Sequence, residues 1–531
     1  MRSIDAPTLK GWIGDGRELA ILGAREEGEF GRSHLFWAVP CPLSRAELRA
    51  RALLPRRSVR ACCVDGGEGG LAERLAAYLE GIGCTDVSVL AGGTPAWEAA
   101  GFVLFSGVNV PSKAFGEWVE HEYGTPSVDP AELDAMMRSG TDMVVLDSRP
   151  MDEFRNMSIP GAVDVPGGEL VYRIGALAPR PETTVVVNCA GRTRSIMGAE
   201  SLRSAGVPNR VVALRNGTMG WELAGLRCAR GETASFPAGV PEGAALARER
   251  AAAFAAARGV RETDAAGLSA LMDDGGRTTY LLDVRDPAEY AAGHLPGSRS
   301  APGGQLVQAT DRWVAARGAR VVLVDDDGVR ARMAGGWLRE MGGWYVHALR
   351  ARPGDLTERG AAPRPECPEA DALPVETVSP EELSALLASG GAEVVQLSRS
   401  LEFREGHIPG ARWGVRTRLA AMAPFGGDGR LVVLAAEDEA VARLAVPELR
   451  GLTTAPVRVL EGGMAAWRAA GLPLRADRRT PADAECVDAY LRPYDRNEGE
   501  EDAMREYLSW EVDLVREVAR DGDARFGGVR A

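Results

Sequence analysis

Short apolar runs alternate with amphipathic stretches along the whole chain, and each run ends at a polar or glycine-rich turn. The run Thr184–Val187 predicts a buried strand, and Ser195–Ser204 has the spacing of a helix. The residues between them, Ala190–Arg194, are too few for anything except a tight turn. Strands alternating with helices are typical of a parallel sheet covered by helices, whose functional loops follow the carboxyl ends of the strands. The pattern therefore predicts an α/β fold.

Three signatures recur along the chain and divide it into similar units. The first is an apolar strand that ends in Arg and is followed by Glu and an aromatic residue, as in Leu281–Arg285 with Glu289 and Tyr290. The second is the strand, loop and helix around Cys189. The third is a strand followed by Gly-Gly-x-x-x-Trp or a relative of it, ending at Trp97, Trp221 and Trp467. These tryptophans are 124 and 246 residues apart, close to one and two repeats of one length, so we expect four copies.

The four copies predict four domains and a tail. We place the domains at residues 5–105, 126–236, 260–360 and 375–478, and a C-terminal helical tail at 479–531. Each domain is expected to be a mostly parallel sheet flanked by helices. The stretch 242–259 is rich in Ala, Arg and Glu and predicts a helical connector. In the tail, one helical stripe contains Met504, Leu508, Val512 and Val515, which favours docking onto the domains over binding of a partner.

Cys189 lies where a predicted strand ends and a loop with two arginines begins. A tight turn in front of a helix directs backbone N–H groups and the positive end of the helix toward an anion or thiolate. Arg192 and Arg194 add full positive charge, which is expected to lower the pKa of the thiol and to favour the nucleophilic thiolate. A buried core thiol is the alternative for a lone cysteine. That alternative leaves the glycine and the two arginines of the loop unexplained.

The composition narrows the function classes. The chain has 531 residues, of which 45% are apolar and 26% charged, as in ordinary globular proteins. A net charge of −13 disfavours nucleic acid and anionic membranes as partners. With no signal-peptide pattern and no apolar run of membrane-spanning length, a cytoplasmic location is expected. The eight cysteines form no Cys-x-x-Cys pair, so neither a disulfide framework nor a metal site is indicated, and we expect no cofactor.

The three signatures together resemble the rhodanese superfamily of sulfurtransferases. The resemblance rests on Asp147–Arg149 with Glu153 and Phe154, on the Cys189 loop and on Gly217–Trp221, and it covers nearly the whole chain as four tandem rhodanese-like domains. In that family the cysteine takes a sulfane sulfur from a donor such as thiosulfate. It holds the sulfur as a persulfide against loop N–H groups and passes it to cyanide or a thiol. The resemblance implies that Cys189 is this cysteine.

The chemistry then defines the expected partners and binding residues. The donor is a small anion, and the acceptor is a thiol of a small molecule or protein. Forked arginine donors suit the oxygens of thiosulfate while the thiolate attacks its outer sulfur. Arg149 is expected mainly to fix the loop through a salt bridge with Glu153, with substrate contact as the second interpretation. The expected substrate-binding set is Arg149, Ala190, Gly191, Arg192, Thr193, Arg194 and Ser195.

The other three copies lack a nucleophile at the position of Cys189. Alignment of the strands places Gly66 there in the first copy, Asp325 in the third and Ala436 in the fourth. Asp325 opens an acidic run that would repel thiosulfate. We therefore expect one active domain, the second, and three that are structural or regulatory.

Other functions are open at the level of sequence. Cdc25-like phosphatases share the fold but need Arg six residues after the cysteine, where this chain has Ser195. The mercaptopyruvate branch of the superfamily has a Cys-Gly-Ser-Gly type of loop, so the arginines here favour an inorganic anionic donor. A non-catalytic scaffold in which Cys189 senses redox state or reactive sulfur is a further alternative. A sensor would be modified once, whereas a transferase would turn over.

Overall fold

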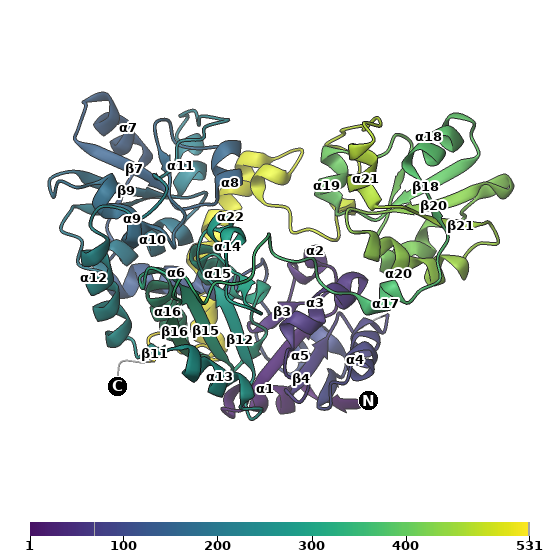
Figure 1. Cartoon of the computed structure of the whole chain (residues 1–531), viewed down its shortest axis with the longest axis horizontal. Coiled ribbons are helices and arrows are strands. Elements are labelled where there is room, and N and C mark those ends of the chain that lie inside the picture. The colour runs from purple at the N-terminus through teal and green to yellow at the C-terminus, as the bar shows by residue number, and fades with distance from the viewer. Residues whose placement is uncertain (68, 529–531) are drawn as a thin grey trace.

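The computed structural model describes residues 1–67 and 69–528 (Figure 1). Four mostly parallel sheets flanked by helices follow one another along the chain, and we number them as domains 1 to 4. The predicted α/β fold with four tandem domains is confirmed. Domain 1 has strands β1 (Arg2–Ile4), β2 (Leu19–Gly23), β3 (Ala38–Pro40), β4 (Ala61–Val64) and β5 (Val87–Leu90), with helices α1 (Ala6–Gly14), α2 (Glu27–Phe30), α3 (Ala46–Leu53), α4 (Leu71–Gly81) and α5 (Gly93–Ala99).

Domains 2 and 3 share most of their order of elements. Domain 2 contains β6 (Ser127–Val128), α7 (Pro130–Arg138), β7 (Met143–Asp147), α8 (Met151–Asn156), β8 (Val163–Asp164), α9 (Leu170–Leu177), β9 (Thr184–Asn188), α10 (Thr193–Ser204), β10 (Val211–Leu214) and α11 (Gly217–Leu223). Domain 3 contains β11 (Arg261–Thr263), α13 (Ala265–Asp273), β12 (Thr279–Asp283), α14 (Pro287–Ala292), β13 (Arg299–Ser300), α15 (Gly303–Gln308), β15 (Arg320–Asp325), α16 (Arg330–Met341) and β16 (Tyr345–Arg350). Domain 3 has no helix equivalent to α11, as its missing third signature predicts.

Domain 4 and the connecting segments complete the chain. Domain 4 contains β17 (Thr377–Val378), α18 (Pro380–Ala388), β18 (Ala392–Gln396), α19 (Ser400–Glu405), β19 (Arg412–Trp413), β20 (Leu431–Ala435), α20 (Glu439–Arg450), β21 (Val457–Leu460) and α21 (Gly463–Ala469). The connectors and tail contribute α6 (Val110–Tyr123), α12 (Ala244–Ala257), α17 (Pro368–Asp371) and α22 (Glu500–Asp521). Helix α12 confirms the predicted connector. Short 3₁₀ turns lie at Leu43–Arg45, Thr310–Arg312, Arg416–Met422, Gly427–Gly429, Asp483–Glu485 and Pro493–Asp495.

The sheets share one topology. The strand orders are β6-β10-β9-β7-β8, β11-β16-β15-β12-β13 and β17-β21-β20-β18-β19, and domain 1 follows the same plan with β3 beside β2. In addition, the short strand β14 (Ala316–Arg317) leaves domain 3 and pairs antiparallel with β2. Domains 1 and 3 are therefore joined through a shared sheet edge.

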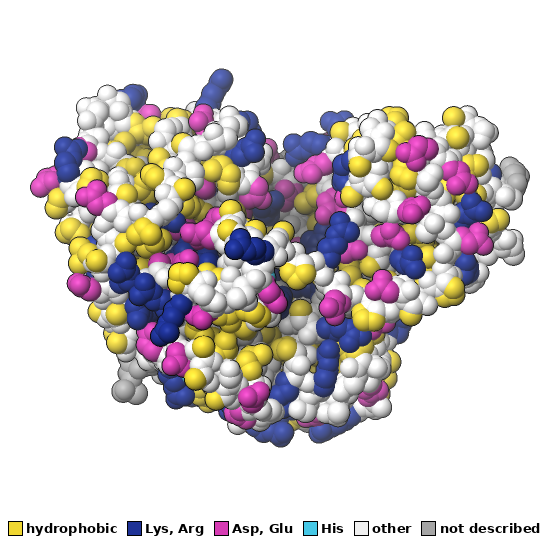
Figure 2. All heavy atoms as spheres, in the orientation of Figure 1, with side chains coloured by type: hydrophobic (Ala, Val, Ile, Leu, Met, Phe, Trp, Pro, Cys, Tyr) yellow, Lys and Arg dark blue, Asp and Glu magenta, His cyan; other side chains and the backbone are white. Residues whose placement is uncertain are grey.

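The hydrophobic core is continuous between the joined domains. One continuous cluster of buried side chains extends through domains 1, 2 and 3 and includes α6, α12 and the end of α22. Domain 4 has two core clusters of its own. A notch separates it from domain 2 in the upper half of the molecule, and charged side chains of both signs are mixed over the visible face (Figure 2). None of the described helices combines the length and apolar character that a bilayer span requires.

Domains 2 and 3 face each other around a close backbone contact. A Cβ added to Gly168 would lie 2.8 Å from the nitrogen of Gly304, and one added to Gly304 would lie 2.8 Å from the nitrogen of Gly168. Gly168 lies two residues before α9, and Gly304 is the second residue of the equivalent helix α15. Only residues without a side chain allow two backbones to approach so closely. The sequences Pro-Gly-Gly-Glu and Pro-Gly-Gly-Gln thus form an approximately symmetric seam.

The tail helix α22 docks onto the domains as predicted, but on a different stripe. Met504 and Leu508 are buried, whereas Val512 is 45% exposed. A helix turns by about 100° per residue, so a residue eight positions after Met504 lies about 80° off its line and one seven positions after lies about 20° off it. Glu511 therefore occupies the buried line, followed by Leu514 and Val518.

Candidate functional site

Cys189 follows the last residue of β9 and begins the loop that leads into α10. Five β-branched or amide residues make β9 fully buried, and the cysteine side chain is itself only 2% exposed. The hydroxyl of Ser195, in the first turn of α10, donates a hydrogen bond to Sγ at 3.0 Å. Helix α10 starts at Thr193, two residues earlier than the sequence predicts. Its first N–H groups therefore lie in the loop itself.

The third repeated signature supports the loop from behind. The backbone N–H of Thr218 donates to the carbonyl of Cys189 at 2.9 Å, and that of Met219 donates to the carbonyl of Ala190 at 3.0 Å. Gly217 has φ +56°, and a Cβ there would lie 2.3 Å from the carbonyl oxygen of Cys189. The glycine of this signature is therefore required by the contact between α11 and the cysteine loop.

Strand register identifies the equivalents of Cys189. Asn188 pairs with Asp147 at the end of the β9–β7 ladder, and the residues after the matching pairs in domains 3 and 4 are Asp325 and Ala436, as predicted. In domain 1 the equivalent residue is Asp65, one position before the predicted Gly66, because Gly23 pairs with Val64. The alignment error arose because the loop of domain 1 is one residue longer before its helix. Two of the three sister domains thus have a carboxylate where domain 2 has its thiol.

Domain 3 shows what its loop binds. The carboxylate of Asp325 accepts hydrogen bonds from the backbone N–H groups of Gly328 and Ala331, each at 3.0 Å. Asp327 accepts from Val329 at 2.6 Å and from Arg330 at 3.1 Å. Four consecutive N–H groups of this loop are therefore satisfied by two carboxylates of the same loop.

The same N–H groups of domain 2 have lost these acceptors. Residues 192–195 are equivalent to 328–331, Cys189 replaces Asp325, and Gly191 replaces Asp327. In the part of the chain that the structure describes, the backbone N–H groups of 192–195 have no hydrogen-bond acceptor. Such a cluster of unpaired N–H groups at a helix start binds anions. Domain 2 therefore has an anion cradle with a thiol at its base.

Arg192 turns away from the thiol toward the connector helix α6. Its guanidinium forms two parallel hydrogen bonds with the carboxylate of Glu117, at 2.8 and 2.7 Å, and a further ion pair with Glu120. Glu117 is fully buried. Arg192 therefore ties the loop to α6, a role that the sequence does not predict because Glu117 lies 75 residues away.

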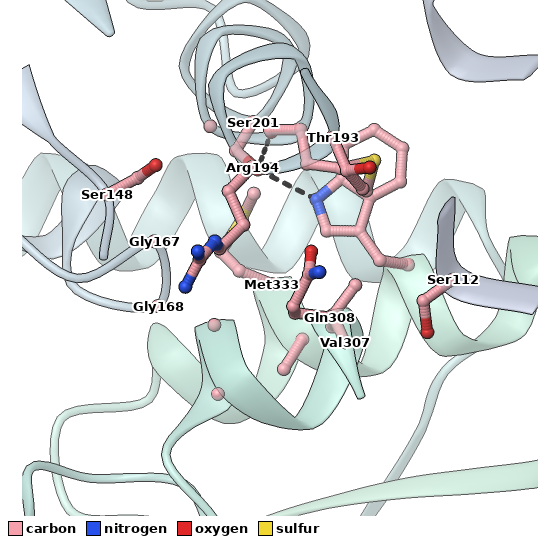
Figure 3. Close-up of a pocket in the computed structure, with 16 residues that line it drawn as sticks. Ser112, Ser148, Gly167, Gly168, Thr193, Arg194, Ser201, Val307, Gln308 and Met333 are labelled. Carbon is pink, nitrogen blue, oxygen red and sulfur yellow. Dashed lines mark hydrogen bonds between the residues drawn. The ribbon is translucent and has the colours of Figure 1, made fainter. Parts of the chain in front are cut away.

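Arg194 is bound within its own domain and reaches toward domain 3. It forms a bidentate pair with Glu153 at 2.9 and 2.7 Å and a hydrogen bond of 3.4 Å to the side chain of Gln305. Although burial acts in the opposite direction, Arg194 lowers the pKa of Glu153 to about 2. Figure 3 shows Arg194 extending toward Gly167 and Gly168, at a cavity of about 40 Å³ between domains 2 and 3. The positive charges of the loop are thus partly compensated by carboxylates.

Arg149 has a different partner from the expected one. Its guanidinium binds both carboxylate oxygens of Asp147 at 2.8 Å and the carbonyl of Met157, rather than the carboxylate of Glu153. Asp147 also accepts a 2.8 Å hydrogen bond from the side chain of Asn188, next to the cysteine. The expected bracing role of Arg149 thus acts through the end of β7.

The tail helix α22 covers the outer side of the loop. Glu511 accepts a 3.2 Å hydrogen bond from the hydroxyl of Thr193 and pairs with Lys113 of α6 at 3.1 Å. A Cβ on Gly191 would lie 3.1 Å from the other oxygen of Glu511. Ala190 packs against the apolar side chains of α22. These contacts were missed from the sequence; the available signal was a glutamate seven residues after Met504 on the docking stripe.

A wider cleft of about 280 Å³ lies between domains 2 and 3 beside the loop. Ser148, Asp164 and Arg285 are among its lining residues. Asp164 is 2% exposed, and burial, reinforced by Asp147, raises its pKa to about 7. No group of His, Cys, Asp and Glu side chains suited to a metal ion is found in the described residues.

Comparisons with known proteins agree with this geometry. The family described as rhodanese-like domain matches residues 129–224, 264–350 and 379–470. The crystal structure of a thiosulfate sulfurtransferase from Pseudomonas aeruginosa is 45% identical, covers 99% of each chain and superposes with a TM-score of 0.93. A rhodanese-related protein from Thermoplasma volcanium is 25% identical over 20% of this chain and 97% of its own, with a TM-score of 0.18. A 3-mercaptopyruvate sulfotransferase from Escherichia coli is 19% identical over 42% and 97%, with a TM-score of 0.21. A search of curated proteins gives no match.

Proposed function

The chain belongs to the family of proteins with rhodanese-like domains, and we propose that it is a sulfurtransferase that moves the sulfane sulfur of thiosulfate to a thiol or to cyanide through a persulfide on Cys189. The anionic donor and thiol acceptor follow from this chemistry. All eight cysteines are free, in agreement with a reducing compartment such as the cytosol.

The observation that carries the proposal is the exchange of Asp325 for Cys189 in one loop geometry. An aspartate oxygen and the outer sulfur of a cysteine persulfide both lie two bonds beyond Cβ. The N–H groups that bind the carboxylate in domain 3 are therefore placed to bind the persulfide anion in domain 2. Domain 2 alone has the thiol, so we assign the reaction to domain 2.

The reaction has two displacement steps. The thiolate of Cys189 attacks the outer sulfur of thiosulfate, the new S–S bond forms, and the old S–S bond breaks with its electron pair leaving on sulfite. The persulfide anion then lies in the cradle of residues 192–195. In the second step cyanide or an acceptor thiolate attacks the outer sulfur, and the Cys189 thiolate is the leaving group. No external oxidant or reductant is needed.

The remaining loop residues have assigned parts in this proposal. The N–H groups bind the donor first, and Arg194 adds positive charge beside them although it is paired with Glu153. Ser195 donates to the sulfur and stabilises the thiolate. Arg192 and Thr193 hold the loop to α6 and α22, and Ala190 and Gly191 complete its backbone.

The test is steady-state formation of thiocyanate and sulfite from thiosulfate and cyanide, with the wild type beside Cys189→Ser. We expect turnover in the wild type and none in the variant, together with the mass of one added sulfur atom on Cys189 after incubation with thiosulfate alone. A wild type that takes up one sulfur but never turns over with cyanide or thiols would establish a sensor. Turnover by Cys189→Ser would refute the assignment to this cysteine.

A further inference from the structure

A second cleft lies between domains 1 and 3, where β14 joins β2, and its lining is strongly basic and aromatic. Its volume is about 390 Å³, within the range of sites for small molecules. No carboxylate side chain is among its described lining residues. The side chains that matter are those of Arg17, Arg317, Arg339, Trp37, Trp344 and Tyr345. In a chain of net charge −13, this local excess of positive charge needs an explanation.

Arg317 has no counter-ion in the described residues. Its guanidinium stacks 4.0 Å from the ring centre of Trp37, and its Nε is buried without a hydrogen-bond partner. No hydrogen bond or ion pair of this side chain is formed within residues 1–67 and 69–528. Burial lowers the pKa of Arg317 to about 10, opposed by the charge of Asp523, whose carboxylate is paired with Lys10 at 2.7 Å. The Arg317 side chain is therefore half-buried, and it has no direct carboxylate partner among the described residues.

Two buried arginines of the chain show the contrast. Arg416 is 8% exposed and pairs with Glu47 and Glu448. Arg330 is 1% exposed and pairs with four carboxylates. Because an unpaired buried charge costs several kcal/mol, folded proteins rarely leave one. Arg317 lacks such a carboxylate partner among the described residues, and its side chain lines the cleft.

Arg339 and Arg17 extend the same pattern. Arg339 donates to the carbonyl of Trp344 at 2.8 Å, but its Nε is buried without a partner, and burial together with the charge of Arg261 lowers its pKa. Arg17 is exposed, and its side chain forms no hydrogen bond or ion pair within the described residues. Three guanidinium groups thus face one cleft with free donors.

We propose that this cleft binds a small organic anion that carries a planar ring, with its phosphate or carboxylate on Arg317 and Arg339 and its ring against Trp344 and Tyr345. The face of the Arg317 guanidinium is used by Trp37, so its edge, which carries the N–H donors, is left for an oxyanion. The aromatic and apolar walls account for the ring, because a bare inorganic anion would leave them in water. The site is separate from the Cys189 loop and extends beyond the proposed sulfur transfer.

The experiment uses the full chain and three probes: adenosine monophosphate, adenosine and inorganic phosphate. Binding is followed by calorimetry and by tryptophan fluorescence, since Trp37 and Trp344 line the cleft. We expect the monophosphate to bind at least tenfold more tightly than either adenosine or phosphate and to quench the fluorescence. Arg317→Met is expected to weaken this binding about tenfold or more, the loss of one charge-assisted contact. The exposed Arg359→Met serves as the matched control and is expected to bind as the wild type does.

Arg317→Met removes a half-buried charge that has no direct carboxylate partner, so its melting temperature is expected to be at least that of the wild type, and its rate of thiocyanate formation unchanged. Failure of the sulfur-transfer assay would therefore not affect this result, and the reverse holds as well. Absence of binding by the monophosphate at millimolar concentration, equal affinity for inorganic phosphate, or unchanged affinity in Arg317→Met would each overturn the proposal.

Discussion

Domains 2 and 3 have the same loop but fill it differently. In domain 3, Asp325 and Asp327 satisfy four backbone N–H groups from within the loop. In domain 2, Cys189 and Gly191 take their places, and the N–H groups are left for a ligand. The loop of domain 3 therefore binds its own carboxylates, whereas the equivalent N–H groups of domain 2 have no acceptor among the described residues. The comparison teaches that a carboxylate in place of the thiol can coincide with additional hydrogen bonds inside the loop.

The arginine five residues after Cys189 in domain 2, or after Asp325 in domain 3, shows a second difference. Arg194 pairs with Glu153 of its own domain and touches Gln305 of the next, whereas Arg330 pairs with Glu289 of its own domain and with Glu169 of the other. The contacts are the same by symmetry, but domain 3 has the larger number of carboxylates around its arginine. The arginine of domain 3 is therefore held by more ion pairs than the equivalent arginine of domain 2.

The largest expected effect comes from converting one loop into the other. Cys189→Asp places a carboxylate among the N–H groups of residues 192–195, so turnover is expected to fall below detection. Because a charged acceptor satisfies these groups, the variant is expected to be more stable to unfolding than Cys189→Ser by about 1 to 3 kcal/mol. Thiocyanate formation and urea unfolding measure the two effects. A less stable Cys189→Asp would show that the N–H groups do not form an anion site.

The next effect concerns Gly217 of the third signature, which shapes the cysteine loop and also contributes to stability. Gly217→Ala introduces a Cβ 2.3 Å from the carbonyl of Cys189 at φ +56°, so the loop must shift. Turnover is expected to fall about 100-fold, since a displacement of about 1 Å in a reactive group has such an effect. Unfolding free energy is expected to fall by about 2 to 4 kcal/mol, as for a strained and overpacked site.

Domain 4 offers the matched control for this substitution. Gly463 has φ +59°, and its Cβ would lie 2.6 Å from the carbonyl of Ala436. Gly463→Ala is expected to lose similar stability while keeping the turnover of the wild type. Equal loss of turnover in both variants would mean that Gly217 acts only through global stability.

Arg194 and Arg330 lie at equivalent positions, but their substitutions are expected to have opposite orders of effect on stability and on turnover. Arg330→Met removes one partner from each of four carboxylates and is expected to cost about 3 to 5 kcal/mol of stability. Arg194→Met removes a partner from one carboxylate, costs less stability, and is expected to lower turnover about tenfold through loss of charge beside the donor. Chemical denaturation and the thiocyanate assay are run on both variants. The crossed pattern fails if Arg194→Met is the less stable of the two.

The fold was largely predictable because its signals are local. The strand before Cys189 and the helix after it follow from apolar spacing, and the connector α12 follows from its content of Ala, Arg and Glu. The first repeat is the most divergent copy. The sequence places Gly66 at the position of Cys189, whereas strand pairing places Asp65 there, and the family match begins only at residue 129. Strand pairing resolved the register, which a loop of altered length hides in the sequence.

The sequence identified Cys189 and its loop as the candidate site, but not the residues that surround them. Cys189 and its loop are contiguous in sequence, whereas Arg192 binds Glu117 and Thr193 binds Glu511, which lie 75 and 318 residues away. Long-range ion pairs depend on how the domains dock, and the hydrophobic periodicity of the sequence does not predict the docking. The same holds for the basic cleft, where Arg17 and Arg317 meet only because β14 joins the sheet of domain 1.

The last expected effect depends on pH and concerns a carboxylate that domain 2 has and domain 3 lacks. Asp164 is paired in register with Asp147, and the equivalent residue of domain 3 is Ser300. Asp164 has an oxygen that is buried without a hydrogen bond, and its pKa is raised to about 7, first by burial and then by Asp147. Between the unfolded pKa of about 3.9 and this value, the folded protein binds a proton that the unfolded chain does not.

Stability contributed by this group therefore falls as pH rises from about 4 to 7 and stays low above that range. Asp164→Ser removes the effect. The free energy of unfolding of the variant is therefore expected to rise relative to that of the wild type as pH rises, by roughly 4 kcal/mol at most at pH 8. Unfolding by urea at pH 5 and pH 8 measures the difference, and a difference independent of pH would contradict it. Because Asp164 lines the cleft between domains 2 and 3, a loss of turnover in the more stable variant would mean that domain 2 keeps this carboxylate for catalysis.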